Sequence, residues 1–362
     1  MVARRVRMVK GPATVAVRGS CRVLGNNVSC QIISVRAGKA LPFEPDYGCR
    51  LRVRLGRYGR TWTADPAIAG TSIWHGVVRE ILALANEQKR ITVMLTGDTD
   101  TGKSTFSAYL ANMVLAKEMK PCIIDGDIGQ GDLAPPSAIG AAVMSKPVTD
   151  LRDIPANLFE FVGSISPAGI ECFVAGKLRS ITDRCTSFGN VIIVNTDGYV
   201  RDNGVSYKMQ LAEELQPNAI VCLGDNLPLF DKLESGPWQV LRAKASSQAY
   251  KSRSERIGRR LDQFIRYVGD GFASIALEQI RFVYIDGIFS PFEMQQSPMK
   301  QLEPENMEGM FVGLGSGKVE GFGVIASIAR GRLNVQTDAQ VFNKVYLSNI
   351  RLDKDRATEI KF

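Results

Sequence analysis

The chain has 362 residues, of which 45% are hydrophobic and 23% charged, and its net charge is +8. A chain of this length is expected to fold as two or three domains, and no apolar run approaches the roughly 20 residues that span a bilayer. The basic N-terminus lacks the apolar core of a signal peptide, so we expect an intracellular protein, cytoplasmic or, in a eukaryote, nuclear. The excess of positive charge favours a polyanionic partner such as nucleic acid.

The cysteines and the single histidine restrict the chemistry that this chain can perform. Its seven cysteines are scattered without a C-x-x-C pair, and His75 is the one histidine. We therefore expect reduced thiols and no zinc site. A general base in this chain is expected to be a carboxylate.

Residues 1–72 consist of short apolar runs divided by Gly, Asn and Pro, a pattern typical of an antiparallel β-rich domain. Alternate residues of a strand share one side, so the arginines of this region predict a basic face that either meets solvent or contacts RNA. These arginines are Arg50, Arg52, Arg54, Arg57 and Arg60.

A helix is predicted next, from Ile73 to Gln88, with Thr71 and Ser72 as its cap. The residues expected on its apolar face are Ile73, Val77, Ile81 and Leu84.

The segment from Ile91 to Leu115 reads as a buried strand, a glycine-containing loop and a helix. The loop matches G-x-x-x-x-G-K-[ST] at every fixed position, in the strand–loop–helix context of a phosphate-binding loop. Lys103 is expected to reach the β- and γ-phosphates, and Ser104 to hold Mg²⁺. The residues predicted to bind a nucleoside triphosphate are Gly97, Asp98, Thr99, Asp100, Thr101, Gly102, Lys103, Ser104 and Thr105.

A second buried strand ends in Asp125 and Asp127. A carboxylate that faces the phosphate loop from such a strand is what Mg²⁺-dependent phosphoryl transfer requires. In an extended chain both side chains point the same way, so the spacing does not choose between them. The alternative is that both are turn residues.

Further strands alternate with helices up to the run AIVCLG at residues 219–224, which predicts a mostly parallel sheet with ligands at the carboxyl ends of its strands. One of these strands is followed by polar residues that should overlook the active site. They are Asn195, Thr196, Asp197 and Tyr199.

The stretch from Arg242 to Arg266 carries eight basic residues against two acidic ones. Arginines beside a triphosphate site are expected to form a lid over the transferring charge, here near residues 245–266. From about residue 270 the pattern returns to β. The fold class predicted is α/β, with a central P-loop NTPase domain (73–269) between an N-terminal β-rich domain (1–72) and a C-terminal one (270–362).

Several motifs, in this order along the chain, resemble those of polynucleotide 5′-hydroxyl kinases. They are GDTDTGKST, DGDIGQG, FVGSISP and NTDGYVRDNG, and the terminal GLG, GFGVI, VQT and IRL runs follow the same layout. This family contains the kinase subunit of the mRNA 3′-end cleavage complex and its archaeal relatives. The resemblance implies transfer of the γ-phosphate of ATP or GTP to the 5′-hydroxyl of RNA, with DNA as a further substrate, and a Mg²⁺ cofactor.

The resemblance also implies roles for individual residues. Lys103, Ser104 and Thr105 would hold the phosphates and the metal. Asp127 is chosen over Asp125 because it stands immediately before I-G-Q, and it would orient or deprotonate the 5′-hydroxyl and bind Mg²⁺. Gln130 would face the substrate.

The lid of the family carries three arginines and an aromatic residue, and that register falls here on Lys251, Arg256, Arg260 and Tyr267. The first arginine is thus replaced by lysine, which lacks the bidentate fork, and Arg253 is an alternative phosphate contact. Tyr199 stands where the family has a tryptophan that stacks on the terminal base. Tyrosine can still stack, although less strongly.

Other functions are compatible with parts of the sequence. A catalytically weak ATP-binding scaffold subunit of an RNA-processing complex, with protein partners, would tolerate the changes at Lys251 and Tyr199. Partitioning or carrier ATPases typically have a lysine after the first loop glycine, where this chain has Asp98. A small-molecule kinase would leave the N-T-D-G-Y segment unexplained.

Overall fold

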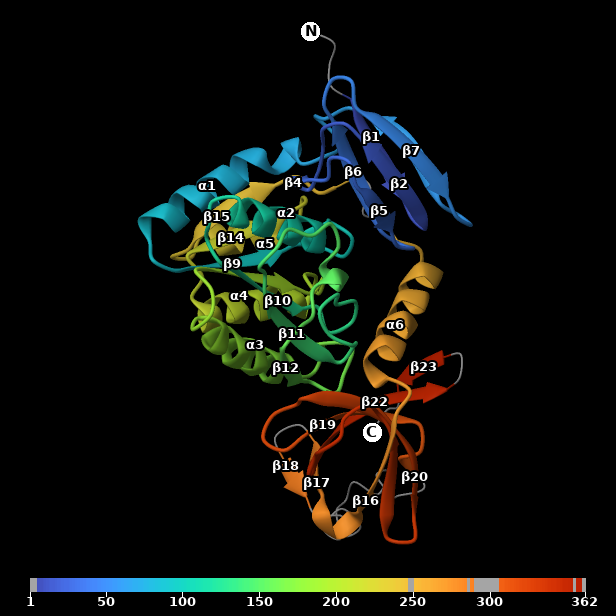
Figure 1. The fold of residues 1–362 in the computed structure, drawn as a ribbon. Helices are drawn as coiled ribbons and strands as arrows, with labels where there is room; N and C mark the ends of the chain where they lie inside the picture. The colour runs from blue at the N-terminus through green and yellow to red at the C-terminus, as the bar shows by residue number, and fades with distance from the viewer. Residues whose placement is uncertain (1–4, 247–250, 285–286, 290–305, 354–355, 360–362) are drawn as a thin grey trace. The chain divides into compact units, whose positions relative to one another are not determined.

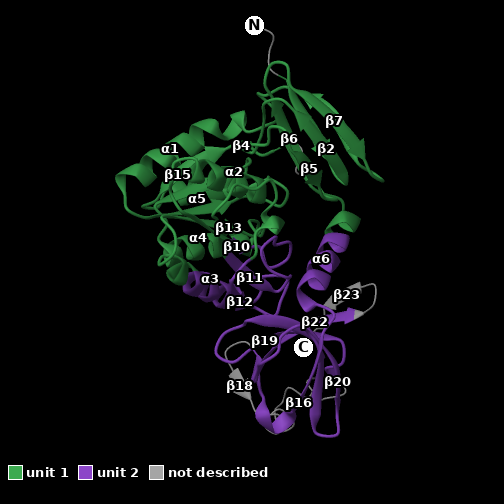
Figure 2. Ribbon diagram, in the orientation of Figure 1, with its two compact units in different colours: residues 1–124, 142–155, 182–256 green, residues 125–141, 156–181, 257–362 purple. Residues whose placement is uncertain are grey.

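The computed structural model describes residues 5–246, 251–284, 287–289, 306–353 and 356–359 (Figure 1). It divides into two compact units (Figure 2). Unit 1 contains residues 1–124, 142–155 and 182–256, and unit 2 contains residues 125–141, 156–181 and 257–362. The three-domain division at 72/73 and 269/270 stays a prediction, and residues 247–250 of the expected lid lie outside the described residues. Within the described ranges, no helix is both long and apolar enough to cross a membrane.

The N-terminal region of unit 1 folds into two small sheets, with strand orders β4-β3-β6-β1-β8 and β5-β2-β7. Its strands are β1 (Val6–Lys10), β2 (Ala13–Arg18), β3 (Cys21–Val23), β4 (Asn26–Asn27), β5 (Ile32–Val35), β6 (Ala40–Pro45), β7 (Arg50–Leu55) and β8 (Arg60–Ala64). In β2 the apolar residues Ala13, Val15 and Val17 are buried, whereas Thr14 and Arg18 are exposed. This alternation of period two is the reason why the segment forms a half-buried strand. The predicted β-rich N-terminal region is confirmed.

The first long helix differs in detail from its prediction. A 3₁₀ turn (Ser72–Trp74) leads into α1 (His75–Glu87), and the side chain of Thr71 does not cap either element. The Thr71 hydroxyl instead donates to Glu44 Oε1 at 2.8 Å. The most buried face of the helix is rotated from the predicted one and shares only Ile81 with it, since Ile73, Val77 and Leu84 are half-buried. The buried residues are Val78, Ile81, Leu82 and Ala85.

A seven-stranded sheet has the order β12-β11-β10-β13-β9-β14-β15. Its strands are β9 (Ile91–Thr96), β10 (Pro121–Gly126), β11 (Ala138–Val143), β12 (Leu158–Phe161), β13 (Val191–Thr196), β14 (Ala219–Leu223) and β15 (Gln239–Ala243). Strand β9 pairs in parallel with β13 and β14, and β14 with β15. Strands β10, β13 and β14 are buried along their whole length, which explains their continuous apolar sequences.

The sheet departs from the parallel pattern at one end, because β12 pairs antiparallel with β11, a strand that the sequence did not predict. The helices that follow α1 are α2 (Lys103–Leu115), α3 (Glu171–Cys185), α4 (Asn203–Leu215), α5 (Leu227–Glu234) and α6 (Arg253–Val268). The unit boundary falls inside α6, after Arg256. The α/β class with a mostly parallel P-loop sheet is confirmed.

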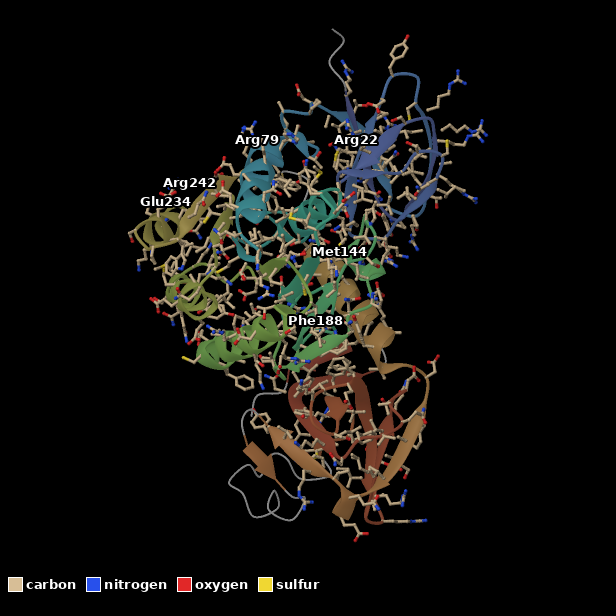
Figure 3. The ribbon with its side chains drawn as sticks, turned by 60° about the vertical axis from the view of Figure 1, so that its left-hand side comes forward. Arg22, Arg79, Met144, Phe188, Glu234 and Arg242 are labelled. Atoms are coloured by element: carbon tan, nitrogen blue, oxygen red, sulfur yellow. The ribbon has the colours of Figure 1, made fainter. Side chains whose placement is uncertain are left out.

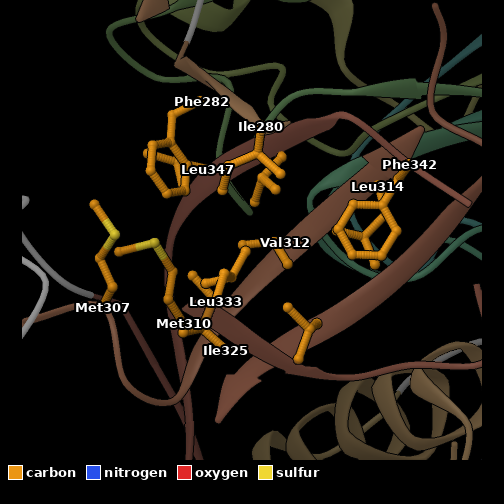
Figure 4. Packing of buried hydrophobic residues seen from close by; sticks show 12 residues of the cluster. Ile280, Phe282, Met307, Met310, Val312, Leu314, Ile325, Leu333, Phe342 and Leu347 are labelled. Carbon is orange, nitrogen blue, oxygen red and sulfur yellow. The ribbon is translucent and has the colours of Figure 1, made fainter. Parts of the chain in front are cut away.

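The C-terminal part of unit 2 is an eight-stranded sheet of order β16-β21-β20-β19-β22-β17-β18, with β23 paired to β22. The strands are β16 (Phe272–Ala276), β17 (Arg281–Tyr284), β18 (Gly287–Phe289), β19 (Met310–Gly315), β20 (Gly321–Ala329), β21 (Arg332–Gln336), β22 (Lys344–Asp353) and β23 (Arg356–Glu359). Side chains such as Met310, Val312 and Leu333 form its buried core (Figure 4). The predicted C-terminal β-rich region is confirmed.

Candidate active site

The phosphate loop connects β9 to α2 within unit 1. Gly97 and Gly102 both have positive φ, at 147° and 98°, which favours glycine. A Cβ atom at Gly97 would lie 2.2 Å from the Leu223 carbonyl oxygen, so the loop fits against the end of β14 only without a side chain. Gly102 is the N-cap of α2 and has no side chain to cap it. The N-terminus of α2 is therefore suited to an anion, and a nucleotide phosphate fits the loop.

Lys103 opens α2 and is buried. Its Nζ donates to the carbonyl oxygens of Gly97, at 2.7 Å, and Asp98, at 2.8 Å. The ammonium group thus lies against the backbone of the loop that it is predicted to serve. The next residue, Ser104, is half-buried, and its hydroxyl accepts from Asn195 Nδ2 at 3.5 Å.

The loop after β13 lies beside the phosphate loop, as expected for carboxyl ends of neighbouring parallel strands. A Cβ atom at Gly198 would come within 2.3 Å of Thr99 Oγ1 and 2.8 Å of Thr99 N. Asp197 fixes the loop internally, because its carboxylate accepts from the Tyr199 backbone N–H at 2.8 Å and from the buried Lys208 ammonium at 2.9 Å. Tyr199 is half-buried.

The start of the predicted lid is attached to the phosphate loop by Asp100. This carboxylate accepts from the Lys251 backbone N–H at 3.0 Å, the Lys251 ammonium at 3.2 Å and the Arg256 guanidinium at 2.6 Å. Burial alone would raise the pKa of Asp100, but the N–H and the two cations outweigh burial and hold that pKa below its ordinary value. Arg253, in contrast, is exposed. Asp100 was expected to contact the nucleotide, and its link to the lid was not anticipated.

In unit 2, Asp125 and Asp127 have different environments. Asp125 is 1% exposed, and its carboxylate accepts backbone N–H groups from Asp132 and Leu133. Asp127 is half-buried, and its Oδ1 accepts from the N–H groups of Gly129, at 3.1 Å, and Gln130, at 2.9 Å. Both aspartates therefore shape the turn after β10, and Asp127 is the more accessible of the two.

The second half of α6 binds the segment that follows Asp127. Arg260 Nε donates to the Gly129 carbonyl oxygen at 2.9 Å, and the buried Arg259 forms an ion pair with Asp132. Gln263 Nε2 donates to the carbonyl oxygen of Gly131 at 3.1 Å, and the Tyr267 hydroxyl donates to that of Leu133 at 2.6 Å.

Residues 259, 263 and 267 lie on one face of α6, because they are spaced four positions apart. That spacing was the available signal for Arg259 and Gln263, which the sequence analysis did not single out. Tyr267, assigned to the lid by resemblance, is half-buried, and burial raises the pKa of its phenol to about 12.

The predicted residues thus fall into two groups. Unit 1 brings together the phosphate loop, the loop that carries Tyr199, and two lid residues, Lys251 and Arg256. The group in unit 2 consists of Asp127, Gln130 and Arg260. The catalytic, metal-binding and substrate-binding roles assigned to these residues stay predictions.

The segment that carries the phosphate loop is similar to a known protein family. Residues 97–269 match the family model described as "mRNA cleavage and polyadenylation factor CLP1 P-loop". Two solved structures of Clp1p resemble this chain with a TM-score of 0.74 over 96% of both chains, at 12% and 11% identity. One is the wild-type Clp1p–Pcf11p complex, and the other concerns the extended Pcf11p interface and the loss of ATP in a point mutant. At this identity, these matches show the fold.

Several curated relatives are named for an enzymatic activity. A polyribonucleotide 5′-hydroxyl-kinase of Pyrococcus abyssi is 33% identical over 181 residues, which is 50% of this chain and 51% of that protein. One of Pyrococcus horikoshii is 28% identical over 229 residues, 63% of this chain and 62% of that protein. A CLP1 homolog of Brugia malayi is 30% identical over 43% of this chain and 38% of its own length. The matches span only part of each relative, and they confirm the resemblance seen in the sequence.

Proposed function

We propose that this protein is a polynucleotide 5′-hydroxyl kinase that transfers the γ-phosphate of ATP or GTP to RNA, because residues 97–269 match the CLP1 P-loop family model. One observation carries this proposal: a complete phosphate loop holds two lid cations through its own Asp100. The names of the Pyrococcus relatives support the same activity. RNA is the proposed acceptor because those relatives are named for it, and DNA is the alternative to be tested.

Lys103 and the N-terminus of α2 hold the triphosphate in this proposal. The Lys103 ammonium would exchange its two carbonyl contacts for oxygens of the β- and γ-phosphates, and the backbone N–H groups of the loop would surround the same oxygens. Ser104 and Asp127 would hold Mg²⁺, which when bound neutralises charge on the phosphates. A side-chain hydroxyl and a half-buried carboxylate are oxygen ligands that suit this ion.

Asp127 is the proposed general base. Its carboxylate is more accessible than that of Asp125, which is buried and accepts hydrogen bonds from backbone N–H groups. Asp127 Oδ1 already accepts two N–H groups, which fixes the orientation of the side chain. A fixed carboxylate can orient the attacking 5′-hydroxyl and accept its proton as the bond to phosphorus forms.

The lid residues and the loop after β13 are proposed to position the two substrates. Arg256 and Arg260, with Lys251 or Arg253, would stabilise the charge that develops on the transferred group. Tyr199 would stack on the terminal base and Gln130 would contact the acceptor. Neither contact reads sequence.

A catalytically weak scaffold is the second candidate. One observation favours it besides the changes at Lys251 and Tyr199. The matched Clp1p structures concern an assembly with Pcf11p, so a protein partner is part of either proposal. Transfer of labelled γ-phosphate to matched 5′-hydroxyl RNA and DNA oligonucleotides, with ATP and with GTP, distinguishes the two candidates.

Two variants test the assigned roles in the same assay. Lys103→Ala and Asp127→Asn are each expected to lower transfer by at least about 10²-fold, as loss of one transition-state contact does. The exposed Lys89→Ala and Asp270→Asn are matched controls that should transfer at the wild-type rate. Absence of transfer by a wild-type protein that still binds ATP would favour the scaffold. Undiminished transfer by Asp127→Asn would exclude that residue as the base.

A further inference from the structure

The outer face of the small sheet β5-β2-β7 is basic. The register pairs Thr14 with Arg54, Ala16 with Arg52 and Arg18 with Arg50 across β2 and β7. On the other side of β2, Ser34 and Ile32 lie opposite Thr14 and Ala16, and Arg36 continues the same alternation. We call this surface the basic strand face, and its arginines are Arg18, Arg36, Arg50, Arg52 and Arg54.

The orientation of the basic strand face is fixed by the packing beneath it. The intervening residues Val15, Val17 and Val35 are between 0% and 3% exposed, so the arginines must point outward. All five arginines are exposed. Figure 3 shows side chains with nitrogen ends projecting from the blue N-terminal strands.

The positive charge of this face is largely uncompensated. Strands β2, β5 and β7 contain no aspartate or glutamate. Arg36 forms an ion pair with Asp153 at 2.7 Å. Among the residues that the structure describes, Arg18, Arg50, Arg52 and Arg54 have no ion-pair partner. Four arginines kept close together without carboxylates repel one another, and a polyanion would relieve that repulsion.

Two further features match a nucleic-acid strand better than an acidic protein. The turns at either end of β7 expose tyrosines: Tyr47 is fully exposed, and Tyr58 is 78% exposed with the Arg57 guanidinium 5.0 Å from its ring centre. Exposed aromatic rings beside arginines provide stacking platforms for unpaired bases. A hollow of about 280 Å³, lined by residues that include Thr14, Arg36 and Arg54, lies at the other end of the face from Arg18.

This hollow lies at the end of the sheet that is connected to the lid. β2 begins at Ala13, three residues after Lys10, and Lys10 forms an ion pair with Glu255 of α6 at 2.7 Å. Glu255 precedes Arg256, which binds Asp100 of the phosphate loop. All of these residues belong to unit 1, so the basic strand face and the lid start are parts of one compact body.

We propose that the basic strand face binds the phosphate backbone of single-stranded RNA downstream of the 5′ end, with Tyr47 and Tyr58 stacking on its bases. This assignment deepens the proposed kinase function and rests on it for the identity of the strand. The face contributes affinity without reading sequence, because its contacts are charge and stacking. Its contribution therefore depends on the length of the RNA, whereas the contacts at the 5′ end do not.

The test is binding of fluorescent RNA to the full chain, without ATP, at several salt concentrations. Arg50→Gln/Arg52→Gln/Arg54→Gln is compared with the control Arg79→Gln/Lys89→Gln/Arg90→Gln, which removes the same charge from exposed positions on and after α1. Of these control residues, Arg79 is labelled in Figure 3. With a 20-nucleotide RNA, the first variant should bind at least about 10-fold more weakly. Its slope of log affinity against log salt should be lower by about 2, because each lost phosphate contact removes about 0.7. The control variant should change neither quantity.

A 4-nucleotide RNA and an acidic peptide complete the test. The triple arginine variant should bind the 4-mer as the wild type does, and Tyr58→Ala should weaken the 20-mer by about 5-fold or more. The proposal would be overturned if the triple arginine variant and the control variant lost equal affinity for the 20-mer. It would also be overturned if the wild type bound polyglutamate as tightly as the 20-mer RNA. Phosphate transfer to the 4-mer is measured in parallel. It reports on the kinase function alone, so the two proposals can fail separately.

Discussion

Gly198 is the residue at which a single methyl group should impair nucleotide binding from outside the phosphate loop. A Cβ atom there would lie 2.8 Å from the Thr99 backbone nitrogen, and 3.4 Å is the lower limit of an ordinary contact. The Thr99 hydroxyl, at 2.3 Å, can rotate away, but the backbone nitrogen cannot. Gly198→Ala must therefore displace the loop backbone by about 0.6 Å, which is enough to misalign a phosphate contact.

The expected cost follows from the hydrogen bond that is lost. A hydrogen bond to a charged group contributes about 1.5–3 kcal/mol, so ATP should bind about 10- to 150-fold more weakly to Gly198→Ala. Calorimetric titration of ATP into the full chain measures this change. The melting temperature should fall little, because the loop can shift without opening the core.

Gly176→Ala is the matched control, since no atom lies within 4 Å of the added Cβ and alanine favours the α3 helix in which Gly176 lies. It should bind ATP as the wild type does and melt at the same or a higher temperature. If Gly198→Ala bound ATP within about threefold of the wild type, the steric argument would be wrong.

Three further predictions concern other contacts. Asp100→Asn should release the lid and raise its susceptibility to limited proteolysis. In the wild type, whose Asp100 pKa is lowered, the stabilisation is present above the ordinary carboxyl pKa of about 4 and should be lost as the pH falls further, which digestion with the acid protease pepsin can follow. Arg259→Met removes the buried ion pair with Asp132 and should cost about 3–5 kcal/mol in urea unfolding. Tyr199→Ala should weaken RNA binding by about 5-fold or more, with ATP affinity unchanged in titrations.

The sequence predicted local structure well where one short segment contains all the necessary information. The phosphate loop is such a segment, because its glycines, Lys103 and the following helix are contiguous. Strand β11 was missed because Ala138–Val143 consists mainly of alanine and glycine, which have low β-propensity. The capping prediction at Thr71 was wrong because Glu44, distant in sequence, accepts from the same hydroxyl.

The candidate active site also depends on contacts that the sequence does not reveal. Spacing could not choose between Asp125 and Asp127, because alternate residues at the end of one extended segment point the same way. Their different exposure arises from the turn that each carboxylate binds, which no local pattern describes. Arg259 is paired with a residue 127 positions away, so in the sequence it was only one of the basic residues of the expected lid. Long-range partners of this kind cannot be read from periodicity.

The division into units has a practical consequence for anyone who wishes to dissect this protein. Each unit is assembled from three separate stretches of chain, and the boundaries cut through β10, β11, α3 and α6. A truncated chain that ends at any single point would cut through one of these elements or leave the elements beside it without the residues that they pack against. Neither half can be obtained by simple truncation, so biochemical work must proceed by point substitution in the intact polypeptide.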